Sequence, residues 1–246
     1  MSSSVSPSCL EGVENTSLDD VLTGIYGIAA GNMTIQYNDI AGIHQMGVEL
    51  YRTADVTIAR NRITDIPLGS SAVSIETAAN VTIASNHFGP SGGGGVLFTY
   101  TNSAHIYHNN FYQISYSEGW NSGGNTGLVW DDGYPSGGNY WSHFAGTDRC
   151  SGGNQSVCTF PDGLGDSVYG GVGGYGGADR FPFVGAFPDP LVPKITIEES
   201  FFGPSNPLIL ALGIAVVGVV TVAVFIILRK RRKPPTEAVR TPPQQA

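Results

Sequence analysis

The stretch Met33-Thr34-Ile35-Gln36-Tyr37-Asn38-Asp39-Ile40 is repeated three more times along the chain. The later copies are Val56-Thr57-Ile58-Ala59-Arg60-Asn61-Arg62-Ile63, Val81-Thr82-Ile83-Ala84-Ser85-Asn86-His87-Phe88 and Ala104-His105-Ile106-Tyr107-His108-Asn109-Asn110-Phe111. Their asparagines, Asn38, Asn61, Asn86 and Asn109, lie 23, 25 and 23 residues apart. A second phrase keeps the same period, as Gly47-Val48-Glu49-Leu50, Ala72-Val73-Ser74-Ile75 and Gly95-Val96-Leu97-Phe98. A fixed period of about 20 to 50 residues is typical of stacked repeats, so the sequence predicts a solenoid.

The composition of each repeat predicts strands rather than helices. Short runs of Val, Ile, Thr and Phe alternate with polar residues and are separated by Gly or Asn. A strand of five residues spans roughly 17 Å, so one repeat has room for three short strands and three bends. We therefore expect an all-β, parallel β-helix whose coils stack about 4.8 Å apart. Two columns of inward-facing side chains are predicted. The first consists of Ile35, Ile58, Ile83 and Ile106, and the second of Ile40, Ile63, Phe88 and Phe111.

The recurring asparagines are predicted to have a structural role at the bend between these columns. Asparagine tolerates a left-handed backbone, and its amide can hydrogen-bond to its copy in the next coil. A turn ladder is therefore favoured over a role in ligand binding. The predicted ladder consists of Asn38, Asn61, Asn86 and Asn109.

With these repeats in view, the chain resembles right-handed parallel β-helix proteins of the carbohydrate-binding and sugar-hydrolase type, including the NosD-like group. Gly138-Asn139-Tyr140-Trp141-Ser142-His143-Phe144-Ala145-Gly146-Thr147-Asp148 resembles the Gly-Asn-Tyr-Trp-Ser-Asp-Tyr-x-Gly-x-Asp segment that ends the NosD-like β-helix. Asp162-Gly163-Leu164-Gly165-Asp166-Ser167-Val168-Tyr169 and Asp179-Arg180-Phe181-Pro182-Phe183 resemble two further motifs of that group. The resemblance covers about residues 24–187 and implies a right-handed coil. The chain departs from the pattern in having few coils and a cysteine-containing insert at 149–160.

The charge distribution argues against a nucleic-acid partner. The first 228 of the 246 residues carry 6 basic and 19 acidic side chains, a formal charge of −13. Phosphate binding requires clustered Lys and Arg, which this part of the chain lacks. An acidic surface suits cations or salty surroundings, but a plain solvated surface is the favoured interpretation.

The C-terminal part of the sequence predicts a membrane anchor. Leu208 to Leu228 form 21 residues without a charge, long enough for a helix that spans the membrane once. Five basic residues follow at 229–233, which places the 229–246 tail in the cytoplasm and the β-helix outside the cell membrane. A proline-rich stalk is expected at 188–207, between the β-helix domain (24–187) and the helix.

Residues 1–23 are expected to form an N-terminal cap or the remnant of missing upstream sequence. Ser17 to Leu22 could form a short helix or an incomplete coil that covers the end of the stack. An exported domain needs a secretion signal, and no basic start followed by an apolar run is visible. A truncated start is therefore favoured over a tail-anchored protein with its domain inside the cell.

Aromatic residues near the end of the repeats have two interpretations. They stack on sugar rings as a ligand-binding surface, or they plug the open end of the β-helix. The plug is favoured because large aromatic side chains usually bury much of their area. The candidate ligand-binding residues are Trp120, Trp130, Tyr134 and Trp141.

The insert suggests a disulfide and raises the question of a metal. Cys150 and Cys158 enclose seven residues and are expected to form a disulfide loop, leaving Cys9 over. Calcium is the cation considered for Asp148, Asp162 and Asp166, although a turn stabilised by these side chains is favoured. Copper is not expected, because the histidines and methionines do not cluster in the sequence.

The sequence contains no column of paired carboxylates of the kind that β-helix glycosidases require. Asp131 and Asp132 are adjacent, and neighbouring residues of an extended chain diverge. The leading hypothesis is therefore binding or adhesion to polysaccharide or envelope partners. The alternatives are a carbohydrate-active lyase or hydrolase and a NosD-like accessory protein for metal handling. An acid pair would favour the enzyme, and a His/Met cluster would favour the metal role.

Overall fold

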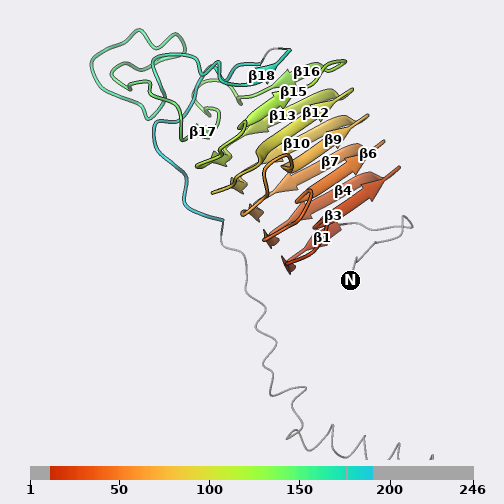
Figure 1. The fold of residues 1–246 in the computed structure, drawn as a ribbon. Coiled ribbons are helices and arrows are strands. Elements are labelled where there is room, and N and C mark those ends of the chain that lie inside the picture. Colours follow the sequence, from red (N-terminus) through yellow and green to blue (C-terminus); the bar gives the residue numbers. More distant parts are fainter. Residues whose placement is uncertain (1–11, 176, 191–246) are drawn as a thin grey trace, which may run out of the picture. The chain divides into compact units, whose positions relative to one another are not determined.

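The computed structural model of the chain describes residues 12–175 and 177–190. These residues form a parallel β-helix in which three six-stranded sheets surround one core (Figure 1). Every neighbouring strand pair within the sheets is parallel, because each coil adds one strand to each sheet. The predicted all-β solenoid is therefore confirmed.

The strands of the three sheets follow in the order of stacking. Sheet A contains β1 (Gly12–Glu14), β4 (Gly31–Gln36), β7 (Ala54–Ala59), β10 (Ala79–Ala84), β13 (Asn102–Tyr107) and β16 (Thr126–Val129). Sheet B contains β2 (Ser17–Asp19), β5 (Asp39–Ala41), β8 (Arg62–Ile63), β11 (His87–Phe88), β14 (Asn110–Phe111) and β17 (Tyr140–Trp141). Sheet C contains β3 (Ile25–Ile28), β6 (Val48–Tyr51), β9 (Ser71–Glu76), β12 (Gly94–Thr99), β15 (Gly119–Asn121) and β18 (Gly173–Gly174).

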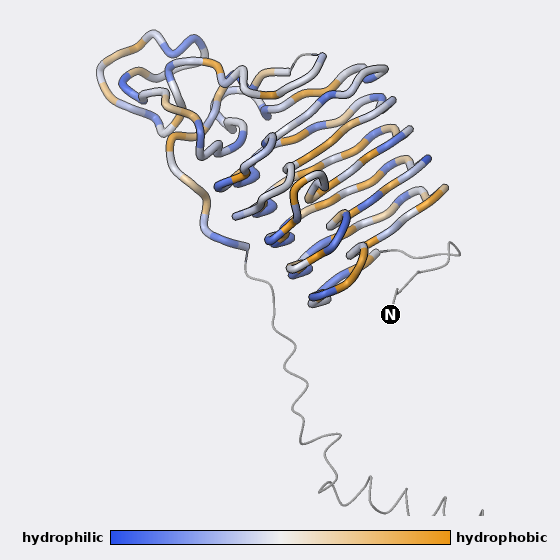
Figure 2. The backbone as a smooth tube through the Cα atoms, in the orientation of Figure 1, coloured by the Kyte–Doolittle hydropathy of each residue, from blue (hydrophilic) through white to orange (hydrophobic). Residues whose placement is uncertain are grey.

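The core consists of columns of apolar side chains, one from each coil. Sheet A pairs Ile35 with Ile58, Ile58 with Ile83, and Ile83 with Ile106. Sheet B pairs Ile40, Ile63, Phe88 and Phe111 in the same way. All eight side chains are fully buried, and hydrophobic residues recur at matching places in successive coils (Figure 2). The two predicted columns are correct, because a period of two along each strand directs alternate side chains inward.

The left-handed backbone at the bend lies one residue earlier than predicted. Positive φ angles of 56°, 55°, 59° and 57° occur at Tyr37, Arg60, Ser85 and His108, each directly before a ladder asparagine. The asparagines themselves are absent from the positive-φ residues of the described chain. The preceding residue makes the turn, which leaves the asparagine free to point its amide along the stack.

The first coil begins before Gly24, the predicted start of the β-helix. Strands β1 and β2 pair in parallel with β4 and β5, so residues 12–19 already belong to the stack. Of the two expectations for this segment, the structure has the incomplete coil and not the helix. Hydrogen bonding to the coil above, such as Thr16 N to Asn38 Oδ1 at 3.0 Å, explains the extended form.

The other end of the core is closed by aromatic side chains. Trp130 and Trp141 are each 1% exposed. The Trp141 ring stacks on Phe111 with centroids 4.3 Å apart, and Trp130 meets Phe98 edge-on at 5.9 Å. The plug favoured from the sequence is therefore confirmed for these two residues. The alternative role in ligand binding is wrong for them, because burial of both indoles in the core leaves neither face open to a sugar.

The predicted membrane anchor lies outside the described residues. This applies to the helix Leu208–Leu228, the 229–246 tail, Cys9 and the stalk from residue 191 onward. Within residues 12–175 and 177–190, no helix has the length and apolar character needed to cross a membrane.

Candidate functional site

The asparagine ladder is a continuous, buried network of hydrogen bonds. In each rung the backbone N–H and Nδ2–H of one asparagine both donate to Oδ1 of the asparagine in the next coil, at 2.9 to 3.1 Å. The remaining Nδ2–H donates to a backbone carbonyl of the preceding coil, as from Asn86 to Ile58 at 2.9 Å. The network includes a fifth asparagine, Asn139, which the spacing did not reveal because it lies 30 residues after Asn109. All these amide groups are engaged, so the ladder has no capacity left for a ligand.

Asp179 terminates the ladder. Its carboxylate accepts hydrogen bonds from the backbone N–H of Asn139 at 2.6 Å, from Nε1 of Trp141 at 2.8 Å and from the N–H of Phe181 at 3.0 Å. The side chain is fully buried, and this burial raises the pKa of Asp179 to about 6 despite the three N–H donors. The sequence motif around Asp179 is therefore a structural cap of the β-helix.

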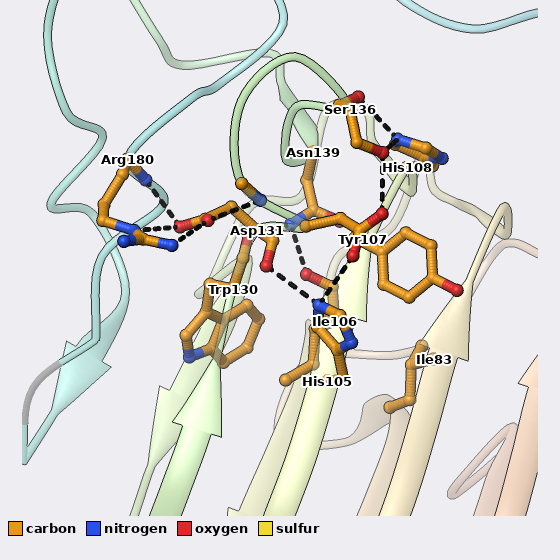
Figure 3. A network of polar contacts seen from close by, with 12 residues as sticks. Ile83, His105, Ile106, Tyr107, His108, Trp130, Asp131, Ser136, Asn139 and Arg180 are labelled. Atoms are coloured by element: carbon orange, nitrogen blue, oxygen red, sulfur yellow. Dashed lines mark hydrogen bonds and ion pairs between the residues drawn. The ribbon is translucent and has the colours of Figure 1, made fainter. Parts of the chain in front are cut away.

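A second network holds the loop between β16 and β17 over the end of sheet A (Figure 3). Nε2 of His105 lies 2.9 Å from the carbonyl oxygen of Asp131, and Nε2 of His108 lies 2.8 Å from that of Ser136. The Arg180 guanidinium donates twice to the Asp131 carboxylate, at 2.9 and 2.6 Å. Burial alone would raise the pKa of Asp131, but the hydrogen bonds from Arg180 hold it below its usual range.

The adjacent carboxylates of this loop serve different partners. Asp131 is buried against Arg180, whereas Oδ2 of Asp132 accepts a hydrogen bond from Ser136 at 2.7 Å. Both groups hold the loop in its conformation.

The aspartates considered for calcium stabilise turns of the insert. Asp166 accepts the backbone N–H groups of Arg149 and Cys150 at 3.0 and 2.9 Å. Asp148 accepts those of Asp162 and Gly163 at 3.2 and 2.7 Å. Asp162 in turn caps Leu164 at 3.1 Å. N–H groups therefore occupy the oxygens that a cation would need, and nothing in these contacts supports the calcium interpretation.

The insert also contains a disulfide between Cys150 and Cys158. The enclosed loop is held further by the backbone pair Ser151 and Val157, whose N–H groups donate to each other's carbonyls at 3.0 and 3.1 Å. The insert is thus a small cross-linked loop beside the β-helix coils.

The outer face of sheet C carries the exposed aromatic surface. Trp120 is 41% exposed. It pairs in register with Leu97 of the preceding coil, and the same position is occupied by Ser74 and Glu49 in the two coils before that. A groove of about 280 Å³ lies beside it and has no charged residue in its lining. The lining consists of Met46, Gly69, Ser70, Ser71, Gly94, Gly95, Val96, Leu97, Tyr116, Ser117 and Trp120. This groove was not predicted as a whole, because its residues come from four separate coils.

Of the four predicted ligand-binding aromatics, Trp120 alone lines this groove. Trp130 and Trp141 lie in the core. Tyr134 is 42% exposed but lies on the loop between β16 and β17, with its ring 6.1 Å from Phe181. Tyr116 is 68% exposed and is a further aromatic residue of this groove.

Comparison with known protein families matches residues 12–146 to the family described as "Periplasmic copper-binding protein (NosD)". The chain belongs to the NosD family. The match ends at Gly146, three positions before the disulfide-containing insert begins at Arg149, and it includes every coil that carries a ladder asparagine. Searches of curated proteins and of solved structures found no match.

The family description names copper, but the described residues of this NosD protein do not form a copper-binding set. Within residues 12–175 and 177–190, no group of three or more His, Cys, Asp or Glu is placed to hold a metal ion. The histidine contacts are His44 to Asp20, His87 to Asp189, His105 to Asp131, His108 to Ser136 and His143 to Glu118. Met33 is buried in the core, and the sulfur of Met46 accepts the N–H of Ser71 at 3.3 Å. Copper sites need such ligands to converge, and these point to separate partners.

Proposed function

We propose that this NosD-family β-helix binds polysaccharide outside the cytoplasm and does not cleave it. The observation that carries the proposal is the uncharged groove beside the exposed Trp120 indole on sheet C. An aromatic face packs against the apolar face of a sugar ring, and the serine hydroxyls along the groove can exchange hydrogen bonds with sugar hydroxyls. The flat, regular surface of stacked strands suits an extended ligand.

The proposed location draws on two independent features. The description of the family refers to the periplasm. The apolar segment Leu208–Leu228 with the basic residues after it supports a single membrane anchor with the β-helix on the outer side. Together they favour a binding domain displayed at the cell envelope.

Replacing Trp120 with alanine is expected to weaken binding to neutral polysaccharide by about tenfold or more. A tenfold weaker affinity corresponds to a loss of about 1.4 kcal/mol of binding free energy, which is within the range of one aromatic stacking contact. The measurement is the amount of full-length protein retained on insoluble neutral polysaccharides, with released oligosaccharide assayed in the same tubes. Retention without release supports a binding function, whereas release supports the carbohydrate-active enzyme.

Phe160→Ala is the matched control for this experiment. Phe160 is 64% exposed, like an aromatic binding residue, but it belongs to the insert and does not line the groove. The Phe160→Ala variant is expected to bind like the unaltered protein. Equal loss of retention in both variants, or no retention of the unaltered protein, would reject the groove as the binding site.

Metal handling is the second candidate function, and the family description favours it. The measurement is a copper titration of the full-length protein followed by equilibrium dialysis. Because the described residues do not converge on a metal, His105→Ala and His108→Ala are expected to leave any copper stoichiometry unchanged. A loss of bound copper in either variant would show that these two histidines rearrange into a site.

A further inference from the structure

A second cleft lies along a corner of the β-helix, away from the groove on sheet C. One wall is the column of turn residues Tyr37, Arg60, Ser85 and His108, which occupy equivalent positions in four successive coils. The other wall is formed by the segment Phe187–Pro190, which runs back past the coils (Figure 1). The volume between them is about 440 Å³.

The chain segment that forms the second wall is held in place by specific contacts. Phe187 donates its N–H to Oδ1 of Asn110 at 2.9 Å and accepts Nδ2 of Asn110 at 2.8 Å. One coil further down, the Asp189 carboxylate lies 2.6 Å from Nδ1 of His87. The cleft is therefore bounded on both sides by anchored residues.

The electrostatics of the cleft differ from those of the rest of the domain. Arg60 is exposed and lies over the Tyr37 ring, 5.7 Å from its centroid. It belongs to none of the ion pairs among the described residues, unlike Arg62, which pairs with Asp39 at 3.2 Å. No Asp or Glu is among the residues that line the cleft. Asp189 lies between the lining residues Pro188 and Pro190, but its carboxylate is paired with His87. An arginine without a carboxylate partner in such a place favours an anionic ligand.

The other lining groups suit a sugar. The Ser136 carbonyl can only accept a hydrogen bond, so Nε2 of His108 carries the proton and Nδ1 is left as an acceptor for a hydroxyl. The Ser85 hydroxyl can donate and accept. Phe187, Pro188 and Pro190 supply apolar surface against which a ring can pack.

We infer that this corner cleft binds an acidic saccharide, with Arg60 recognising a carboxylate or sulfate group of the sugar. The column crosses four coils at about 4.8 Å each, so it accommodates several units of an extended chain. The site shares no residue with the groove beside Trp120. Evidence for or against one of the two sites is therefore independent of the other site.

The test is direct binding of short, fluorescently labelled oligogalacturonate to full-length protein, with its methyl ester as the uncharged counterpart. A sulfated dextran oligosaccharide and plain dextran form the second pair, which separates sulfate from carboxylate recognition. Arg60→Gln is expected to weaken binding of the preferred acidic oligosaccharide by about tenfold or more, because a charge-assisted hydrogen bond is lost. Trp120→Ala is expected to leave this binding unchanged.

Arg52→Gln is the matched control. Arg52 is also exposed, has a φ of 55°, lies 4.8 Å from the centroid of the Tyr51 ring and does not line the cleft. The Arg52→Gln substitution should lower binding of the acidic oligosaccharide less than twofold. Equal effects of the two substitutions would show unspecific attraction and overturn the proposal. Oligoglutamate serves as an acidic ligand that is not a sugar, and if it bound as tightly as the acidic oligosaccharide, the assignment to a saccharide would be overturned. If the acidic sugar bound no more tightly than its uncharged counterpart, the role of Arg60 would be overturned.

Discussion

An Asn86→Ala variant is expected to unfold with a free energy about 3 to 5 kcal/mol lower than that of the unaltered protein. Oδ1 of Asn86 accepts two hydrogen bonds from Asn61, and its Nδ2 donates to Asn109, Ile58 and Ala84. Alanine leaves two donors of Asn61 and acceptors in the neighbouring coils buried without a partner. Each such buried group costs about 1 to 3 kcal/mol. Thermal unfolding followed by circular dichroism should show a fall in Tm of about 10 °C.

Asn102→Ala provides the comparison for this loss. Asn102 is exposed on β13, and its side chain accepts one hydrogen bond, from the Thr126 hydroxyl at 2.8 Å. Water can replace that bond, so the expected change in the free energy of unfolding is within about 0.5 kcal/mol. If Asn86→Ala unfolded at the same temperature as Asn102→Ala, the ladder would not stabilise the stack.

The second large effect is a dependence of stability on pH that comes from Asp179. Burial raises its pKa in the folded protein to about 6, whereas the carboxyl of the unfolded chain ionises near 3.8. Between these values the folded state binds a proton that the unfolded state has released. The free energy of unfolding should therefore fall as pH rises from about 4 to about 6, by up to about 3 kcal/mol, and Asp179 should contribute no further change above that range.

Urea unfolding at a series of pH values measures this slope. Asp179→Asn removes the ionising group, so its profile should lack the fall that the unaltered protein shows between pH 4 and 6. Asp65→Asn is the control, because Asp65 is exposed and its φ of 54° suits asparagine equally well. The control should retain the slope, and an identical slope in Asp179→Asn would assign the pH dependence to another group.

The repeat period was enough to predict the architecture of this protein. A phrase that recurs every 23 to 25 residues requires each coil to place the same residue type at the same height, so Ile58 must stack between Ile35 and Ile83. The ladder follows from the same constraint, because a side chain repeated at a bend meets its own copy. Such regularities are local and periodic, and they are visible in one sequence.

Contacts between residues far apart in the chain could be found only from the tertiary structure. Asn139 joins the ladder across 30 residues, and Asp179 caps it from 40 residues beyond that. Trp130 and Trp120 look alike in sequence, yet one fills the end of the core and the other faces solvent. The corner cleft likewise depends on Phe187 returning to Asn110, 77 residues earlier. Periodicity predicts which side chains stack, whereas burial and cleft formation depend on how the aperiodic segments fold back onto the stack.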